Sequence, residues 1–232
     1  MLANPFAVNP APAFDAAPWR LSGVVYGALL NHRPMLVALG SAADAAPYKG
    51  APKAPVLQVK PRNTLVGDGA AVAVPAGTEA LEIGACLAIV IGRAACRVSA
   101  AEAFDVIAGY TIASDIRIPH DSHYRPAVRQ RARDGFCPLG PLVVPASRIA
   151  APDALAVSVA IDGRVVQETD TADRVRTVAQ LVADVTDFMT LQPGDLLLLG
   201  ASHGAPLARA GQSVAITIEG IGTLTHRLVA EA

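Results

Sequence analysis

A continuous apolar run at residues 87–91, rich in β-branched side chains, limits the fold of this chain more than any other stretch. Gly92 stops the run, and a short run bounded by glycine is typical of a strand buried on both faces. Residues 110–114 have the same character and predict a second strand, which ends at Asp115. A carboxylate at a strand end can face a cleft. We therefore expect a sheet with a candidate functional group at one edge.

The segment between these two strands predicts a short amphipathic helix. Ser99 and Glu102 have the spacing of a capping box, in which hydroxyl and carboxylate each satisfy a free backbone N–H group. Phe104 and Ile107 then form an apolar stripe, and Gly109 ends the helix.

The remaining pattern consists of short strands separated by turns. Further strands are predicted at residues 21–30, 56–60, 142–144, 155–161, 196–199, 214–218 and 224–228. Asp162 and Gly163 indicate a hairpin after one of them, and residues 177–189 predict a second amphipathic helix. Many short strands with two helices favour a β-rich α+β fold over a doubly wound sheet.

Composition limits the function classes. A length of 232 residues with 52% hydrophobic residues permits one principal domain with a substantial core. A formal net charge of −1 gives no electrostatic reason to expect nucleic acid or a membrane surface as partner, so we expect small molecules or protein. Cys86, Cys96 and Cys137 lack metal-binding spacing and are expected to be buried, reduced thiols of a cytoplasmic protein. Residues 1–18 lack signal-peptide features, and no later stretch reaches membrane-spanning length.

The first 55 residues are interpreted as an N-terminal arm, the first strand and a possible flap, with residues 56–232 as the catalytic-type domain. Residues 41–55 are rich in Ala, Pro and Gly, which suits either a flap over a site or a connector. His32 is placed on a loop before Pro34, where a histidine is more often solvated than catalytic.

The densest charge follows Asp115 and comprises His120, Asp121, His123, Tyr124, Arg125, Arg129, Arg131, Arg133 and Asp134. Four arginines within nine positions suit a substrate with two or more carboxylates, because guanidinium groups bind carboxylates bidentately. The alternative is a solvated, salt-bridged face, and spacing alone does not decide between them. Lys60 ends a predicted strand and can project its charge into a cleft, although lysines at strand ends are usually solvated. The two histidines lack the further ligands of a metal site.

Six segments together resemble the fumarylacetoacetate hydrolase family: KPRNTLVGDG, LAIVIGRAA, AGYTIASDI, DGFCPLGP, LQPGDLLLLG and the closing GIG. The resemblance runs from about residue 56 to the end and implies a mixed β-roll with a few short helices, usually assembled as a dimer. Within the family, SHYRPAVRQRARDGFCPLG is most similar to the N-terminal half of the isomerase/decarboxylases of 4-hydroxyphenylacetate degradation, a branch of aromatic catabolism.

Family members that resemble this chain use a divalent metal, usually magnesium, held by a Glu-x-Glu pair and an aspartate. The alignment puts Gly84 and Cys86 at the two glutamates and retains Asp115. Magnesium requires several hard oxygen ligands, whereas glycine offers no side chain and a thiol is soft. We therefore expect the metal to be absent or weakly held in this chain. Glu82 would substitute only with an altered strand register.

The acid-base pair of the family, a histidine and a glutamate after the first strand, is also missing, with Met35 about where the histidine is expected. Arg131 stands at the family's active-site lysine, where it keeps the charge but cannot act as a base. Ala201 and Ser202 replace a Thr-Pro pair. The resemblance implies Lys60 and Arg131 as catalytic residues and Arg125, Arg129, Arg133 and Tyr110 as substrate-binding residues.

Two functions are consistent with these departures. In the first, the chain is the N-terminal-type subunit of an enzyme that decarboxylates 5-oxopent-3-ene-1,2,5-tricarboxylate and isomerises 2-hydroxyhepta-2,4-diene-1,7-dioate, with the metal in a homologous companion subunit. In the second, it is an autonomous oxo-acid hydrolase or decarboxylase with an atypical metal site. We favour the first, because the loss of the metal ligands together with the acid-base pair is hard to reconcile with the same mechanism. The sequence leaves open whether the chain forms a homodimer or a heteromer.

Overall fold

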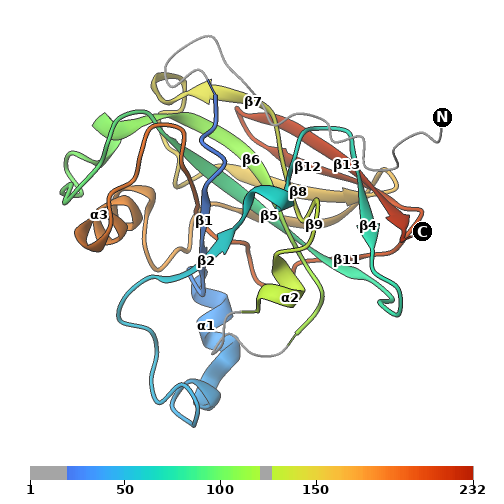
Figure 1. Cartoon of the computed structure of the whole chain (residues 1–232). Helices are drawn as coiled ribbons and strands as arrows, with labels where there is room; N and C mark the ends of the chain where they lie inside the picture. Colours follow the sequence, from blue (N-terminus) through green and yellow to red (C-terminus); the bar gives the residue numbers. More distant parts are fainter. Residues whose placement is uncertain (1–19, 121–126, 232) are drawn as a thin grey trace.

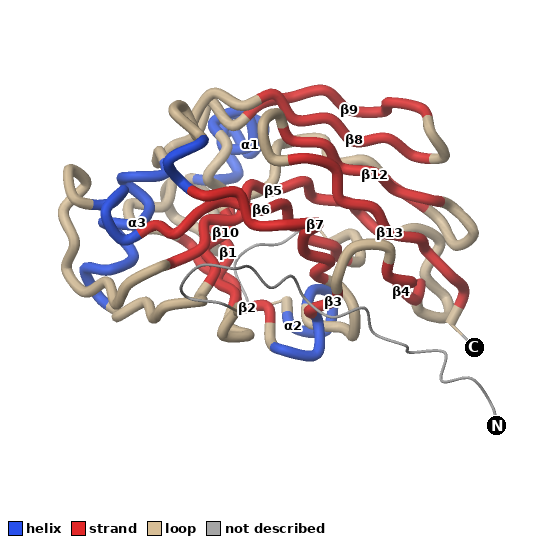
Figure 2. Tube along the Cα trace, turned by 90° about the horizontal axis from the view of Figure 1, so that it is seen from above, coloured by secondary structure: helices blue, strands red, loops and turns tan. Residues whose placement is uncertain are grey.

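Two β-sheets packed against each other form the body of the protein in the computed structural model, which describes residues 20–120 and 127–231 (Figures 1 and 2). The larger sheet contains β1 (Val25–Leu29), β2 (Val56–Lys60), β3 (Leu65–Val66), β5 (Leu81–Ile91), β6 (Ile107–Arg117), β7 (Cys137–Pro145), β10 (Leu196–Leu198) and β11 (Leu207–Ala208). Its order is β2-β1-β10-β5-β6-β7-β3, and β11 pairs with β5.

The smaller sheet has the order β4-β13-β12-β8-β9. Its strands are β4 (Ala70–Val74), β8 (Ala156–Ile161), β9 (Arg164–Asp170), β12 (Ser213–Ile218) and β13 (Gly222–Ala230). Both sheets are mixed, because β1 with β10, β3 with β7 and β4 with β13 are parallel pairs among antiparallel ones. The predicted strands and the β-rich α+β class are confirmed.

Helices are few and short: α1 (Arg33–Leu39), α2 (Val128–Arg131) and α3 (Val178–Phe188), with 3-10 turns at Gly40–Ala43, Arg62–Thr64, Ala103–Val106 and Ala146–Arg148. The predicted helix at 177–189 is α3, and the Thr177 hydroxyl caps it by accepting the N–H of Gln180 at 3.3 Å. The amphipathic pattern of this segment predicts Phe188 on the apolar face, but its side chain is exposed. No helix within the described ranges is long and apolar enough to cross a membrane.

The helix predicted after Ser99 is wrong. Only the 3-10 turn Ala103–Val106 forms, because β6 already begins at Ile107 and leaves too few residues for a helix. The capping interaction itself is present, since the Glu102 carboxylate accepts the Ser99 hydroxyl at 2.6 Å and the Ser99 N–H at 3.2 Å. Phe104, expected in the core, is 47% exposed.

The long strands β5 and β6 lie at the centre of the larger sheet, and their side chains alternate between two apolar clusters. One face, with Leu87 and Ile112, packs against the smaller sheet in the main core. The other face carries Cys86 and Ala113 in a smaller cluster. Asp115 follows Ala113 by two positions and shares that second face, so the strand pattern sets the face on which the candidate site lies.

The N-terminal segment joins the larger sheet through β1, which pairs with β2 and β10. The lobe formed by α1 and the following residues stands off from the sheets at the bottom of Figure 1. The lid assignment for residues 41–55 and the boundary at residue 55 stay predictions. Cys86 and Cys137 are buried free thiols as expected, whereas Cys96 is exposed.

Candidate functional site

Lys60 and Asp115 form a buried ion pair where β2 ends. The Lys60 Nζ lies 2.6 Å from the Asp115 Oδ1, and the two residues are 0% and 5% exposed. The same ammonium group donates to the backbone carbonyls of Ile116 at 2.9 Å, Arg131 at 3.0 Å and Phe136 at 3.0 Å. The expectation of a solvated lysine at the strand end is therefore wrong, because the chain supplies four oxygen partners for its charge.

Arg131 and Gln58 complete the surroundings of the Asp115 carboxylate. The Arg131 Nη1 lies 3.2 Å from Asp115 Oδ2 and 3.0 Å from Gln58 Oε1, and the Gln58 amide donates to Asp115 Oδ2 at 2.6 Å. We call Gln58, Lys60, Asp115 and Arg131 the Asp115 cluster. Sequence analysis missed Gln58, although it stands two residues before Lys60 and therefore on the same face of β2. The Arg131 Nε also donates to His120 Nε2 at 3.1 Å.

The Asp115 carboxyl stays ionised despite its burial. Burial alone raises its pKa, but the cations of Lys60 and Arg131 and the hydrogen bonds from Lys60 and Gln58 outweigh that effect and hold the pKa below its usual value. Burial lowers the pKa of Arg131, and the neighbouring Asp115 opposes that shift. The cluster is thus a network of two cations around one carboxylate, in which the Arg131 Nη2 has no hydrogen-bond partner among the described residues.

The two positions where the family carries glutamates do not fit a divalent metal here. Gly84 lies directly opposite Asp115 in the pairing of β5 with β6. A Cβ atom at Gly84 would lie 2.9 Å from the Ala201 methyl and 2.9 Å from the Asp115 carbonyl oxygen, so the space that a glutamate would need is filled. Cys86 is buried in the smaller apolar cluster, where burial, reinforced by Asp115, raises the pKa of its thiol. Glu82 makes an ion pair with Arg117.

The structure places Tyr110, Arg129 and Arg133, three of the predicted substrate-binding residues, outside this cluster. Tyr110 is buried in the main core on the opposite face of β6 from Asp115. Arg129 is exposed, and its carbonyl accepts a hydrogen bond from the Arg133 Nε at 3.2 Å. Arg125 lies outside the described residues. A cavity of about 500 Å³ beside Arg133 is lined by Asn63, Phe136, Glu231 and residues of β4, and by no member of the Asp115 cluster.

A second buried polar group forms where the start of α1 meets the loop after β10. The Arg174 Nη2 donates to the Asp170 carbonyl at 3.0 Å and to the Ser202 Oγ at 3.2 Å, and the Thr169 hydroxyl donates to the same Oγ at 3.0 Å. His32 forms an isolated antiparallel bridge with Arg174. We call His32, Thr169, Arg174 and Ser202 the Arg174 cluster.

His32 is 7% exposed, so the expectation of a solvated histidine is wrong. The neighbouring Asn31 side chain fixes this segment by donating to the carbonyls of Leu199 at 2.9 Å and Arg176 at 3.1 Å. The His32 Nδ1 accepts the His203 N–H at 2.9 Å. Burial, followed by the charge of Arg174, lowers the pKa of His32, so the ring is neutral near pH 7. Sequence analysis missed Arg174, which had no periodic signal to separate it from the other charges of residues 164–176.

Comparison with known proteins identifies the family. Residues 24–229 match the model for the fumarylacetoacetate (FAA) hydrolase C-terminal domain, so the chain belongs to this family of enzymes. It is 37% identical over 211 residues to the 4-hydroxyphenylacetate degradation bifunctional isomerase/decarboxylase of Escherichia coli. The match covers 91% of this chain and 48% of that protein. The chain therefore spans about half the length of the curated relatives that match it first.

Solved structures confirm the predicted fold. The 2-hydroxyhepta-2,4-diene-1,7-dioate isomerase from Mycobacterium marinum superposes with a TM-score of 0.75 at 32% identity, over 92% of this chain and 77% of that chain. The fumarylpyruvate hydrolase from Pseudomonas aeruginosa, solved with Mn²⁺ and pyruvate, gives a TM-score of 0.81 over 100% of each chain. Its identity of 24% shows a shared fold alone.

Proposed function

We propose that this chain is an N-terminal-type subunit of an isomerase/decarboxylase of 4-hydroxyphenylacetate degradation, and that it works beside a homologous, metal-bearing subunit. The observation that carries the proposal is the packing at Gly84. A glutamate side chain has no room at this position, because the Ala201 methyl and the Asp115 carbonyl occupy the space next to Gly84. With Cys86 buried among apolar side chains, the chain offers Asp115 alone of the three expected ligands.

The extent of the match is compatible with a companion. The chain corresponds to 48% of the Escherichia coli isomerase/decarboxylase, so about half of that enzyme lies outside the match. The substrates would be oxo-acids with two or three carboxylates, namely 5-oxopent-3-ene-1,2,5-tricarboxylate and 2-hydroxyhepta-2,4-diene-1,7-dioate. The proposed location is the cytoplasm.

Within this proposal, Lys60 and Arg131 act as positioning residues rather than as reacting groups. The Lys60 ammonium already has one carboxylate and three carbonyl partners, which leaves no hydrogen for a substrate. Arg131 cannot serve as a base because a guanidinium stays protonated. Their common effect is to hold Asp115 ionised and fixed between β2 and β6.

Reconstitution tests the proposal. The purified chain alone should show negligible decarboxylation. Millimolar magnesium should leave its thermal midpoint unchanged, because a ligand raises that midpoint only if it binds the folded state, and the proposal is that this chain has no complete metal site. Addition of a metal-bearing homologous subunit should produce turnover. Turnover by the chain alone, or a magnesium-dependent rise in its midpoint, would instead indicate an autonomous oxo-acid enzyme. In that case Asp115→Ala should abolish activity and the magnesium response together.

A further inference from the structure

We propose that the Arg174 cluster binds one carboxylate of a small oxo-acid directly, without a metal. The inference rests on the proposed function for the class of ligand, but its geometry and its test concern this chain alone. Arg174 is 6% exposed, and its Nε and Nη1 have no hydrogen-bond partner among the residues that the structure describes.

The hydrogen-bond inventory of Arg174 shows how much is left open. A guanidinium carries five N–H donors, of which the two on Nη2 go to the Asp170 carbonyl and the Ser202 Oγ. The donor on Nε and the two on Nη1 remain. Buried donors without partners are unfavourable and rare in folded proteins, so each requires a partner such as a ligand or an ordered water.

Its neighbours add donors rather than acceptors. The Ser202 Oγ accepts hydrogen bonds from Thr169 and Arg174, which leaves its own hydrogen to donate. The neutral His32 ring uses Nδ1 as acceptor for His203 N–H, so its hydrogen is on Nε2. His32 and Arg174 are partners in an antiparallel bridge, and side chains of such partners project to the same side of the pair. A group of donors around a buried cation is suited to an anion.

The charges around Arg174 favour a singly charged ligand group. Burial lowers the pKa of Arg174, and Asp170, Asp153 and Asp173 oppose that shift only through space, because no ion pair with Arg174 is formed within 4.0 Å in the described part of the chain. The side chains of Asp153 and Asp170 already accept the N–H groups of Val178 and Ala172, at 2.8 Å and 2.9 Å. One uncompensated guanidinium with neutral donors around it matches one carboxylate.

The place of the cluster in the fold also fits an oxo-acid. Ser202 follows Ala201, whose methyl group packs at Gly84 opposite Asp115. Arg174 and Asp115 both influence the pKa of the Cys86 thiol, in opposite directions. The cluster therefore adjoins Gly84 and Asp115, and Arg174 supplies there a positive charge that does not depend on metal ligands.

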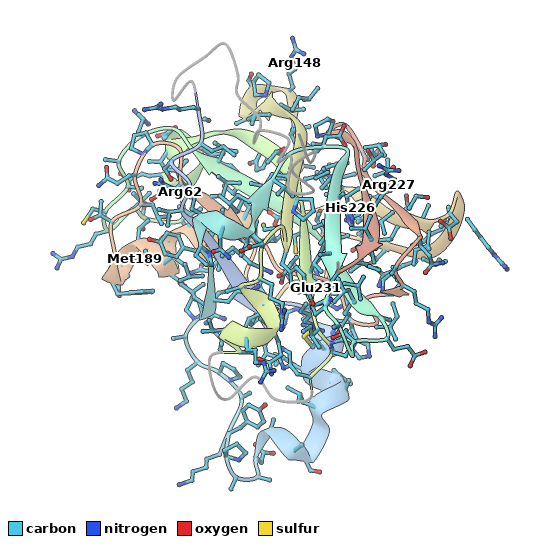
Figure 3. All side chains as sticks on the ribbon, turned by 45° about the vertical axis from the view of Figure 1, so that its right-hand side comes forward. Arg62, Arg148, Met189, His226, Arg227 and Glu231 are labelled. Atoms are coloured by element: carbon cyan, nitrogen blue, oxygen red, sulfur yellow. The ribbon has the colours of Figure 1, made fainter. Side chains whose placement is uncertain are left out.

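Calorimetric titration of the full chain tests the site. Pyruvate and succinate should each bind with saturation at constant ionic strength, whereas sodium chloride should give no saturable heat. Arg174→Met should weaken carboxylate binding by about 10-fold or more, because it removes the charge and its donors. Ser202→Ala should weaken it less, and Arg148→Met should leave it unchanged, because Arg148 projects outward from the turn after β7 (Figure 3).

Three results would overturn the proposal. The first is that the wild-type chain binds neither pyruvate nor succinate, as expected if ordered water accepts the open hydrogen bonds. The second is that Arg174→Met binds the carboxylates as the wild type does. The third is that inorganic phosphate binds as tightly as the carboxylates. If Arg174→Met does not fold, Ser202→Ala decides, and unchanged binding by that variant counts against the site. Failure of the companion subunit to restore turnover, with carboxylate binding intact, would refute the subunit role alone.

Discussion

The Asp115 cluster and the Arg174 cluster are both buried and both contain a guanidinium, but of the two guanidinium groups only that of Arg131 has an ion partner within the described ranges. In the Asp115 cluster, the carboxylate pairs with Lys60 and Arg131 and accepts a hydrogen bond from Gln58, and Lys60 also donates to three carbonyls, although the Arg131 Nη2 has no partner among the described residues. In the Arg174 cluster, three donors of the guanidinium have no partner and no ion pair is formed within the described ranges. Removal of one partner from a buried ion pair is costly, whereas a buried cation without an ion partner suits an anionic ligand.

The largest effect is expected for Lys60→Met. The change leaves Asp115 with a single cation and removes the donor for the carbonyls of Ile116, Arg131 and Phe136. Loss of one partner from a buried pair costs about 3–5 kcal/mol, so the free energy of unfolding in urea should fall by about that amount. Lys53→Met, at an exposed side chain, is the control and should change it little. A loss below about 1 kcal/mol for Lys60→Met would show that the pair does not support the fold.

A buried histidine gives the second largest effect. His226 on β13 (Figure 3) is bonded to the Ser114 hydroxyl at 3.1 Å, and burial lowers its pKa to about 4. The unfolded chain binds a proton near pH 6.5, so the stabilisation is complete above that pH and is lost as the pH falls toward 4. The loss from this group should reach about 3 kcal/mol at pH 4.

Urea unfolding at pH 7 and pH 4 measures this loss of stability. His226→Leu should reduce the difference between the free energies of unfolding at the two pH values. The depressed pKa of Asp115 acts in the same direction, but its stabilisation is lost only below about pH 4, as the pH falls from the unfolded pKa toward the folded one. His226→Leu should therefore remove most of what this histidine and Asp115 together contribute between pH 7 and pH 4. An unchanged difference would mean that His226 is protonated in the folded protein.

Gly84→Ala should have an intermediate effect. The added methyl would lie 2.9 Å from Ala201 Cβ and 2.9 Å from a backbone oxygen, and overpacking of this kind costs about 1–3 kcal/mol. Thermal unfolding of Gly84→Ala and of the double variant Gly84→Ala/Ala201→Gly measures it, with partial recovery expected in the double variant. A stable Gly84→Ala chain would show that this position has room for a side chain and would weaken the case against a metal.

Much of the sheet could be predicted from the sequence, because each strand carries its own evidence. The apolar run at 87–91 and the alternation at 155–161 reflect burial on two faces and on one face respectively. The turn after Ser99 was mistaken for a helix because its capping box is real, and only the start of β6 at Ile107 shows that no helix can follow.

The site was predictable only in part, because its contacts join distant segments. Lys60 and Asp115 were singled out at predicted strand ends and then retained by the family resemblance, but the burial of the lysine depends on three carbonyls that no local pattern reveals. Gln58 was predictable, because side chains two residues apart on a strand lie on the same face, and Gln58 stands two residues before Lys60. The pairing of His32 with Arg174 arises from a single bridge between distant loops, for which the sequence carries no periodic signal.

The smallest effect on stability is expected for Arg174→Met, and it gives the sharpest contrast with Lys60→Met. A buried charge without an ion partner carries an uncompensated desolvation cost, and an apolar side chain of similar length removes that cost. The change leaves the Asp170 carbonyl and the Ser202 Oγ without one donor each, but it removes three open donors from the interior. The free energy of unfolding in urea should therefore stay within about 1 kcal/mol of the wild type, while carboxylate binding is lost. A loss as large as that of Lys60→Met would mean that both clusters stabilise the fold in the same way. A small loss of stability together with a large loss of binding would show that the guanidinium is kept in the interior for its ligand rather than for the fold.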